Sequence, residues 1–319
     1  MFHSVGSIKN NDCLTLAGMR VSVKNFNDQM KYISENYNTI HLRDLFLWQS
    51  GINKIPSRPC VISFDDGLSD VYNNAVPILR QYRLKATLFI IGNSLVNEKP
   101  SWLHEIYEIL DSFSLSSCID VFKHIIPSFR QDMEVNKESV RRGIKEYFLS
   151  LDRLTRLRLL RNIKNEYGGK LIRKPIYFMN AEQIIELSSM GFEIGSHSFY
   201  HERLSTLSLN KINEELKKSK IIIEESINTR CESFSYPYGG YSSFDDRVVG
   251  SLKRNGYYCA CSTIDGVNYR NTNKFKLRRW FVKDKPVNYL TSKFGELKKP
   301  RNRLRSMVKY IAKKGLQYE

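Results

Sequence analysis

Two adjacent carboxylates, Asp65 and Asp66, come directly after the apolar run Cys60–Phe64. A buried parallel strand delivers the side chains at its carboxyl end to one rim of a sheet, where the catalytic groups of α/β proteins gather. Neighbouring carboxylates repel each other, so they call for a cation or a shared proton beside them. The pair therefore predicts a site for something positive at the end of this strand.

Two histidines four residues apart, His197 and His201, supply the second half of the predicted site. They follow a short strand-like run at residues 192–194, and in a helical turn both imidazoles would lie on one side. Two imidazoles and a carboxylate form a metal site with a position open for water. Histidines at this spacing are commonly structural when they occur alone. Their combination with Asp65 and Asp66 favours a metal centre.

Several motifs in a fixed order resemble one family. They are Phe64-Asp65-Asp66-Gly67, Asp70-x-Tyr72, Pro77-Ile78-Leu79, Lys85-Ala86-Thr87-Leu88-Phe89-Ile90, Gly195-Ser196-His197-x-x-x-His201 and Phe234-Ser235-Tyr236-Pro237-Tyr238-Gly239. The series is similar to the polysaccharide deacetylases of carbohydrate esterase family 4, also called the NodB-homology family. The similarity covers residues 1 to about 96 and 176 to about 283. It implies an α/β fold, a distorted (β/α)7-type barrel, and hydrolysis of an N-acetyl or related N-acyl group on a sugar.

The resemblance also assigns roles to individual residues. It implies that Asp66, His197 and His201 hold one divalent metal ion, and that Asp65 is the catalytic base. A backbone N–H at Tyr238 would help to hold the oxyanion. Zn²⁺ is the expected ion for a site of two histidines and a carboxylate, with Co²⁺, Ni²⁺ or Fe²⁺ as alternatives.

The front of the chain resembles a circularly permuted, exopolysaccharide-type branch of this family. Residues 2–5, Phe-His-Ser-Val, are similar to a Tyr-His-x-Val segment that carries the catalytic histidine there. The resemblance predicts that His3 is the general acid. The alternative is a structural histidine at a frayed chain end, because terminal residues are commonly poorly ordered.

One arginine of the unpermuted family is missing, since Ser235 stands where it is expected. Residues 277–282, expected on a strand, resemble a Leu-Pro-Arg-Ile segment of the permuted relatives. We therefore predict that Arg279 pairs with Asp65 and keeps it ionised. Arg278 points to the other strand face by alternation, which makes it the natural control. The alternative is that Arg279 is a surface cation.

Periodicity predicts the elements that position these groups. Helices are expected at residues 26–37, 70–82, 181–190 and 208–228, and further strands at residues 1–6, 85–91, 192–196 and 232–236. Pro77 falls inside the second helix and is expected to kink it. A capping box formed by Asn180 and Gln183 marks the start of the third.

The family pattern lapses between residues of about 100 and 175, where helices are expected at 101–110, 137–149 and 152–167. We interpret this stretch as an insertion in a catalytic domain of residues 1–290, placed to cap the active site or touch a large substrate. Many of its side chains are basic, and these belong either to a binding surface or to solvated helix faces. They include Arg141, Arg142, Lys145, Arg153, Arg156, Arg158 and Arg161.

A basic tail, residues 291–319, ends the chain. Within 298–314 an apolar stripe at Leu304, Met307, Val308 and Ile311 has helical spacing. This pattern favours a helix lying on an anionic membrane, and the alternative is a helix packed on the barrel. The formal net charge of +17 likewise suggests an anionic partner.

Composition narrows the setting. Six cysteines without a C-x-x-C spacing indicate a reducing compartment, and the sequence shows neither a signal peptide nor a membrane span. We expect a cytoplasmic enzyme, peripheral on the inner membrane, acting on an N-acylated glycan or a lipid-linked sugar in cell-surface glycan synthesis. A deformylase of a lipid-linked amino sugar is the nearest alternative. A glycan- or nucleic-acid-binding protein without catalysis is another, but nucleic acid is not expected because no readout motif is present.

Overall fold

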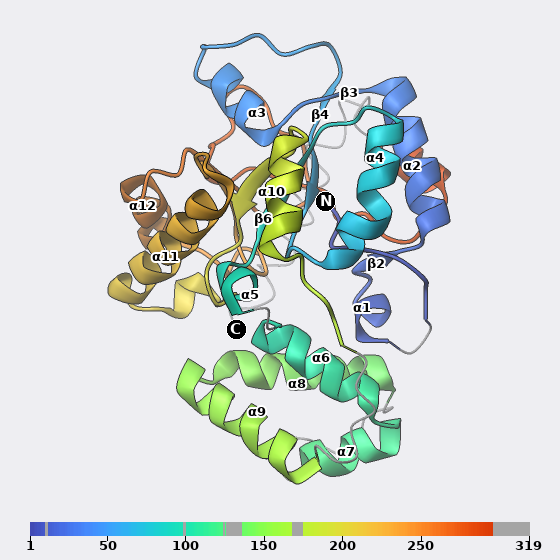
Figure 1. Ribbon diagram of the computed structural model, residues 1–319, viewed down its shortest axis with the longest axis vertical. Coiled ribbons are helices and arrows are strands. Elements are labelled where there is room, and N and C mark those ends of the chain that lie inside the picture. Colours follow the sequence, from blue (N-terminus) through green and yellow to red (C-terminus); the bar gives the residue numbers. More distant parts are fainter. Residues whose placement is uncertain (10–11, 98–99, 124, 126–135, 168–174, 296–319) are drawn as a thin grey trace, which may run out of the picture.

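A parallel sheet of five strands lies at the centre of the computed structural model (Figure 1). The structure describes the chain except for residues 10–11, 98–99, 124, 126–135, 168–174 and 296–319. The strands, in their order across the sheet, are β5 (Ile62–Phe64), β6 (Ala86–Ile90), β7 (Glu193–Ser196), β8 (Ser233–Ser235) and β9 (Cys259–Cys261). Because all neighbours are parallel, their carboxyl ends lie at one edge, as predicted for Asp65 and Asp66.

Two extended segments continue the sheet at its ends and meet each other. Phe2 forms a parallel bridge to the end of β5, and Leu277 forms one to β9. The Val282 N–H donates to the Met1 carbonyl over 3.0 Å, which joins the two segments. The predicted α/β barrel is therefore confirmed, in a distorted form. The strand predicted at residues 277–282 is wrong in detail, because beyond the Leu277 bridge these residues carry no regular ladder.

Short two-stranded pairs accompany the sheet. β1 (Ser4–Val5) pairs with β2 (Arg20–Val21), and β3 (Asn38–Thr39) pairs with β4 (Pro59–Cys60), both in parallel. α1 (Cys13–Leu16) connects the strands of the first pair, and α3 (Leu42–Gln49) connects those of the second. Two further helices are α5 (Gly92–Asn97), which follows β6, and α13 (Val287–Gly295), which comes after the last strand.

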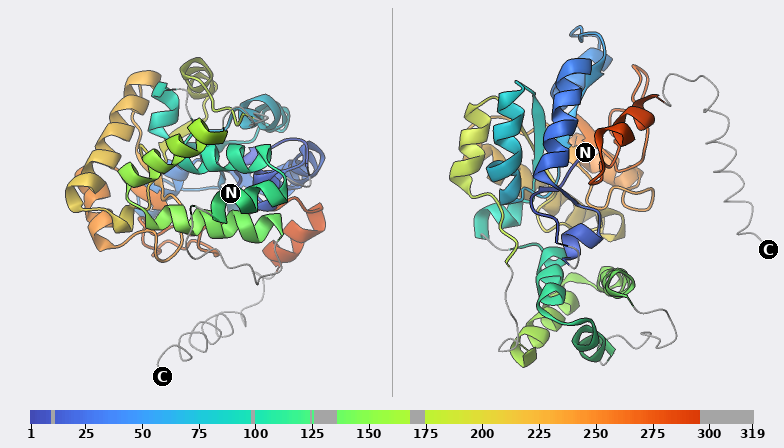
Figure 2. Two further views of the ribbon diagram at one scale, coloured as in Figure 1. Left: turned by 90° about the horizontal axis from the view of Figure 1, so that it is seen from below. Right: turned by 90° about the vertical axis from the view of Figure 1, so that its right-hand side faces the viewer.

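Five other helices cover the outside of the barrel (Figures 1 and 2). They are α2 (Val23–Asn36), α4 (Val76–Gln81), α10 (Ala181–Ser189), α11 (Leu209–Ile227) and α12 (Asp246–Arg254). The kink expected at Pro77 stays a prediction, but the structure shows how the helix accommodates this proline. A π-helical turn, Val71–Ala75, precedes α4, so Pro77 stands in the first turn of a new helix, where a missing N–H costs little.

The sequence between α5 and α10 forms a helical insertion, which hangs below the sheet in Figure 1. Its helices are α6 (Trp102–Ser112), α7 (Leu115–Lys123), α8 (Lys137–Ser150) and α9 (Arg153–Tyr167). α6, α8 and α9 fall where the sequence predicted them, whereas α7 was not predicted. The four helices pack around an apolar cluster that includes Ile106, Phe122, Ile144, Phe148 and Leu160. The same cluster takes in Cys13 and Leu14 of α1 and Leu68 after β5, so it also joins the insertion to the barrel.

The basic residues of this insertion divide into two groups. Arg141 is buried against Glu138 and the Tyr107 hydroxyl, and Arg156 is buried against Glu202. Others, such as Arg158, are exposed. Part of the predicted basic surface is therefore internal structure, and the exposed group fits both a binding surface and a solvated helix face.

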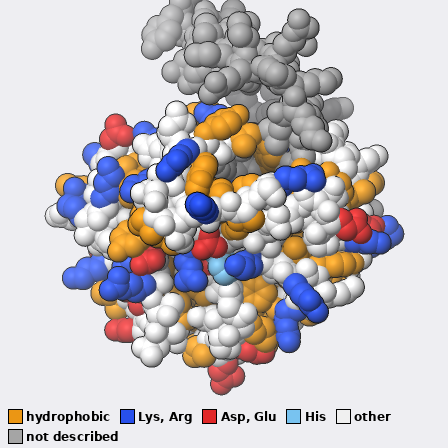
Figure 3. Space-filling model, turned by 90° about the horizontal axis from the view of Figure 1, so that it is seen from above, with side chains coloured by type: hydrophobic (Ala, Val, Ile, Leu, Met, Phe, Trp, Pro, Cys, Tyr) orange, Lys and Arg blue, Asp and Glu red, His pale blue; other side chains and the backbone are white. Residues whose placement is uncertain are grey.

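The described helices include none that is both long and apolar enough to cross a bilayer. On the face away from the insertion, Lys and Arg side chains are spread among apolar and acidic ones (Figure 3). The predicted basic helix at residues 298–314 lies outside the described residues.

Candidate metal centre

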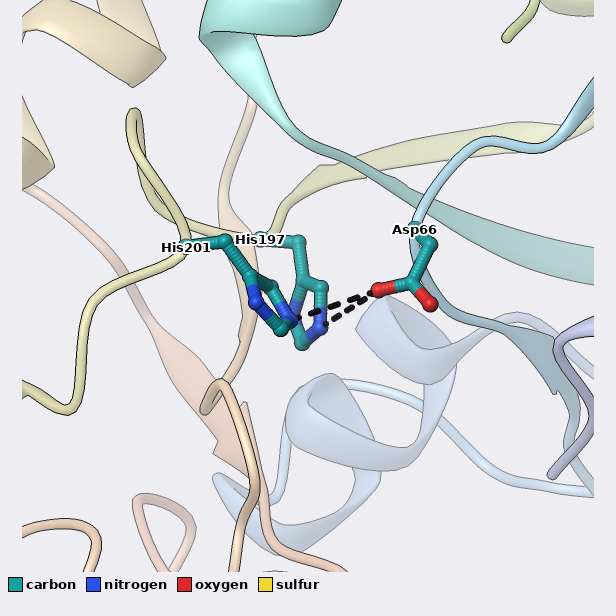
Figure 4. A group of neighbouring side chains, drawn as sticks. All are labelled: Asp66, His197 and His201. Atoms are coloured by element: carbon teal, nitrogen blue, oxygen red, sulfur yellow. Dashed lines mark ion pairs between the residues drawn. The ribbon is translucent and has the colours of Figure 1, made fainter. Parts of the chain in front are cut away.

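Asp66, His197 and His201 come together at the carboxyl edge of the sheet (Figure 4). The Nε2 atoms of His197 and His201 lie 3.3 Å and 3.4 Å from one oxygen, Oδ1, of Asp66. All three residues are at most 4% exposed. In a tetrahedral site with bonds of about 2.0–2.1 Å, neighbouring donor atoms are about 3.4 Å apart. The donor set therefore fits a tetrahedral divalent cation.

The backbone reaches this arrangement through left-handed turns. Asp66 has φ = 77° directly after β5, and Gly67 follows with φ = 79°. On the histidine side, Ser198 and His201 have φ values of 62° and 60°. The helical turn predicted for the histidines is therefore wrong, because a loop with two left-handed residues brings the imidazoles together instead. Their ring centroids are 5.0 Å apart.

The partners of the two histidines suit them as ligands. His197 Nδ1 lies 2.8 Å from the Ser235 carbonyl, so this nitrogen carries the proton and Nε2 keeps a lone pair facing Asp66. Burial lowers the pKa of His201 to about 4, against the opposing charge of Asp66. Burial also acts to lower the pKa of His197, but the charges of Asp65 and Asp66 outweigh it and raise that pKa.

A buried carboxylate holds the loop between the two histidines. Glu215, on α11, accepts hydrogen bonds from the backbone N–H groups of Phe199 and Tyr200, at 3.0 Å and 2.8 Å. The His201 N–H donates to Ser198 Oγ over 3.0 Å. Burial raises the pKa of Glu215 to about 7. Through this carboxylate, α11 helps to hold the geometry of the loop that carries His201.

Asp65 turns to the other side and pairs with Arg279. The guanidinium donates to both carboxylate oxygens, over 2.7 Å and 2.8 Å, and both residues are buried. Ser235 Oγ donates to Asp65 and accepts from Arg279, so this serine hydrogen-bonds to both members of the ion pair. Burial acts to raise the pKa of Asp65, but Arg279 prevails and holds it well below its usual range. The predicted pairing is present, and Arg278 is exposed.

His3 is half-buried and lies on a well-anchored segment. The Phe2 N–H donates to the Ser63 carbonyl over 2.8 Å, and the Asp65 N–H donates to the Phe2 carbonyl over 3.0 Å. The front of the chain is therefore paired with β5 and not frayed. Burial lowers the pKa of His3, while the charges of Asp66 and Asp65 act in the opposite direction.

Tyr238 stands beside the histidines with φ = 63°. Its ring lies 5.0 Å from that of His201, and its hydroxyl donates to the His201 carbonyl over 3.2 Å. Thr263 Oγ1 donates to the Tyr238 carbonyl over 2.9 Å. The next residue, Gly239, also has a positive φ, and a Cβ there would lie 2.6 Å from the Thr263 nitrogen. Only glycine allows this close approach, which fixes the loop carrying the Tyr238 N–H.

A further histidine, which was not predicted from the sequence, also reaches the site. His104 Nε2, on α6 of the insertion, lies 3.4 Å from the second oxygen, Oδ2, of Asp66. The side chain is fully buried. In the sequence it is a lone histidine on an apolar helix, without a motif around it, so nothing local marks it as part of the site.

Comparisons with known proteins agree with this geometry. A family model described as polysaccharide deacetylase matches residues 53–110 and 161–260. YxkH, a putative polysaccharide deacetylase of Bacillus subtilis, is 23% identical over 281 residues, which cover 88% of this chain and 68% of that protein. The chain belongs to the polysaccharide deacetylase family. The poly-beta-1,6-N-acetyl-D-glucosamine N-deacetylase of Staphylococcus aureus is 26% identical over 183 residues, 55% of this chain and 60% of that protein.

Solved structures share the fold of this polysaccharide deacetylase. The Streptococcus pyogenes deacetylase PplD, solved with acetate, has a TM-score of 0.60 at 16% identity and covers 92% of this chain and 95% of its own. IcaB from Ammonifex degensii has a TM-score of 0.57 at 14% identity, with 92% and 93% covered. At such identities the likeness shows the fold alone. The family match passes over residues 111–160, which lie within the helical insertion.

Family membership places the chain among the sugar N-deacetylases. It agrees with the donor set of Asp66, His197 and His201, which is of the kind that holds a divalent metal ion.

Proposed function

We propose that this polysaccharide deacetylase is a metal-dependent hydrolase that removes an N-acetyl group from a sugar unit of a glycan. The observation that carries the proposal is the buried cluster of Asp66, His197 and His201 beside the ion pair of Asp65 and Arg279. One group of side chains can hold a cation, and the other holds an ionised base next to it. Amide hydrolysis by a metal-activated water needs both.

In the proposed mechanism Asp66, His197 and His201 hold the divalent ion. Bound there, a divalent ion would supply Lewis-acid polarisation of the amide carbonyl and would lower the pKa of a water molecule. Asp65, kept ionised by Arg279, accepts a proton from the attacking water. The Tyr238 backbone N–H donates to the oxyanion as the carbon–oxygen bond forms.

We assign to His3 the role of general acid, which protonates the leaving amine. As the carbon–nitrogen bond breaks, a protonated His3 donates a proton to the sugar nitrogen, and acetate is released. Burial lowers the pKa of His3, which makes its imidazolium a stronger acid. His3→Gln should slow hydrolysis while leaving metal content unchanged.

Metal analysis of the purified protein and acetate release from N-acetylated glycans test the proposal. We expect about one equivalent of a divalent metal, Zn²⁺ first, and activity that a chelator removes and added metal restores. Asp65→Asn should keep the metal and lose activity, whereas His197→Ala should lose both. Wild-type activity in either folded variant would overturn the mechanism.

The substrate class is proposed from the relatives and from charge. The Staphylococcus aureus relative is named for poly-beta-1,6-N-acetyl-D-glucosamine, so oligomers of this polymer are the first substrates to assay. A net charge of +17 favours a second candidate, a lipid-phosphate-linked amino sugar on the cytoplasmic face of the membrane. Removal of N-formyl in place of N-acetyl is its nearest chemical variant. Parallel assays of acetate and formate release from both substrates distinguish these candidates.

A further inference from the structure

The histidine contributed by the insertion, His104, has one ring nitrogen held and the other directed at the metal centre. Its Nδ1 lies 2.8 Å from Ser101 Oγ, the side chain at the start of α6. Its Nε2 lies 3.4 Å from Asp66 Oδ2 and has no hydrogen-bond partner that satisfies strict geometry. The neighbouring Phe178 ring packs edge-on against the imidazole at 5.0 Å, which limits its rotation.

The two oxygens of Asp66 face different histidines. Oδ1 lies within 3.4 Å of both His197 and His201, whereas Oδ2 faces His104. His104 is not among the residues whose donor atoms gather within 4.8 Å of one another. It therefore stands behind the carboxylate and not in the ring of donors that would surround an ion.

The protonation of His104 follows from its neighbours. Because His104 stands outside the ring of donors, a bound cation would not lie between it and Asp66, so its nitrogen facing this carboxylate carries the proton, unlike Nε2 of His197. Nδ1 is then an acceptor, which the Ser101 hydroxyl can satisfy as donor. With this tautomer, the Nε2–H of His104 faces Oδ2 of Asp66, and Oδ1 is left for a cation. Carboxylates that bind metals are commonly oriented in this way, and loss of such a partner typically costs about 10–100-fold in metal affinity.

We propose that His104 is a positioning residue of the metal site, through which the helical insertion orients Asp66 for a divalent cation. The proposal rests on the metal site of the proposed function. Other contacts join the insertion to the same rim. Arg156 on α9 pairs with buried Glu202, at 2.8 Å, and lies 4.3 Å from the Trp102 ring on α6. Metal binding and the docking of the insertion are consequently coupled.

Two substitutions of similar size separate the contact from simple packing. The amide nitrogen of Gln reaches about the position of Nε2, and that of Asn reaches about the position of Nδ1. His104→Gln keeps a donor toward Asp66, and His104→Asn removes it. His41→Asn is the matched control, because His41 is also a buried histidine on a helix start but caps α3 away from the metal site.

The primary measurement is the Zn²⁺ dissociation constant of the full chain, by competition with a chromogenic chelator. We expect His104→Asn to weaken Zn²⁺ binding by about 10–100-fold, and His104→Gln and His41→Asn to change it by less than about threefold. Thermal unfolding of the metal-free proteins checks that all three variants fold. A folded His104→Asn variant that binds Zn²⁺ as tightly as the unmodified protein would overturn the proposal.

Two further readouts test the positioning role. Visible absorption of the Co²⁺-substituted protein should keep its bands in His104→Gln, and a changed coordination spectrum would show a direct ligand and overturn the role. Hydrogen exchange in α6 should slow when Zn²⁺ is added to the unmodified protein and not when it is added to His104→Asn. Equal slowing in both would overturn the coupling. If the proposed function itself fails, His197→Ala will bind Zn²⁺ normally, which is a separate outcome.

Discussion

Asp65 and Asp66 are consecutive residues, yet their carboxylates serve different partners. The left-handed backbone at Asp66 turns its side chain toward His197, His201 and His104. Asp65 stays on the barrel side and meets Arg279. The repulsion expected between adjacent carboxylates is thus relieved on each side separately. One local conformation separates the group that can bind a metal from the group that can act as a base.

The Asp65–Arg279 pair gives a prediction about stability and activity. Arg279→Met leaves Asp65 buried without its cation, and such a change typically costs about 3–5 kcal/mol of unfolding free energy. Sugar deacetylation should fall with it, because the unpaired carboxyl tends toward its protonated form. Urea unfolding and acetate release measure the two effects. Arg278→Met, on the exposed neighbour, should change stability by no more than about 0.5 kcal/mol; equal effects from both variants would contradict the pairing.

Glu215 gives a prediction about pH. Its pKa in the folded protein is raised to about 7 from an ordinary value of 4.5. The folded protein then binds this proton more tightly than the unfolded chain does, so the unfolding free energy falls as pH rises from about 4.5 to about 7 and levels off above. The decrease is about 3 kcal/mol. Glu215→Gln should lack this component, which a comparison of denaturant unfolding at several pH values would show. Parallel pH profiles would refute it.

Motifs near strand ends made most of the site predictable from the sequence. Asp65, Asp66, His197 and His201 each follow a short apolar run, and the permuted pattern pointed to Arg279. His104 was not predictable in this way. Its role depends on a helix folding back onto the end of β5, a tertiary contact that leaves no periodic trace in the chain.

At the scale of elements, amphipathic helices were predicted more accurately than irregular segments. α8 and α9 match their predicted bounds closely because apolar residues recur at helical spacing. The loop at residues 197–201 was misjudged because the left-handed residues that shape it, Ser198 and His201, are not glycines. Left-handed φ values are uncommon for such residues and are set here by the surrounding hydrogen bonds.

The insertion carries a prediction of its own. Glu202 follows a proposed metal ligand directly and forms the buried ion pair with Arg156 of α9. Glu202→Met leaves a buried guanidinium unpaired and should cost about 3–5 kcal/mol. Limited proteolysis should then cut within the insertion sooner than in the unmodified protein. Glu146→Met, which removes a more exposed ion pair with Arg203, should cost no more than about 1 kcal/mol. Unchanged cleavage in Glu202→Met would contradict a role of the Arg156–Glu202 ion pair in holding the insertion in place.

At the scale of the whole molecule, the net charge of +17 gives a prediction about location. A chain ended after residue 295 lacks residues 296–319, which include the basic stretch 298–314, but keeps the described barrel and insertion. It should deacetylate a soluble glycan at the parent rate and sediment less with vesicles containing anionic lipid. The difference should shrink in high salt, because screening weakens the attraction. Equal sedimentation of both chains would exclude the tail as a membrane contact.

The left-handed turns at the rim affect how the enzyme fails under stress. Of the seven non-glycine residues with positive φ in the described part of the chain, Asp66, Ser198, His201 and Tyr238 belong to the site. Each such conformation costs about 1–3 kcal/mol and persists only while its surroundings enforce it. Mild urea should therefore extinguish deacetylation at a lower concentration than it melts the secondary structure seen by circular dichroism. The loops that carry these four residues would lose their conformation first, while the strands and helices of the barrel would remain folded.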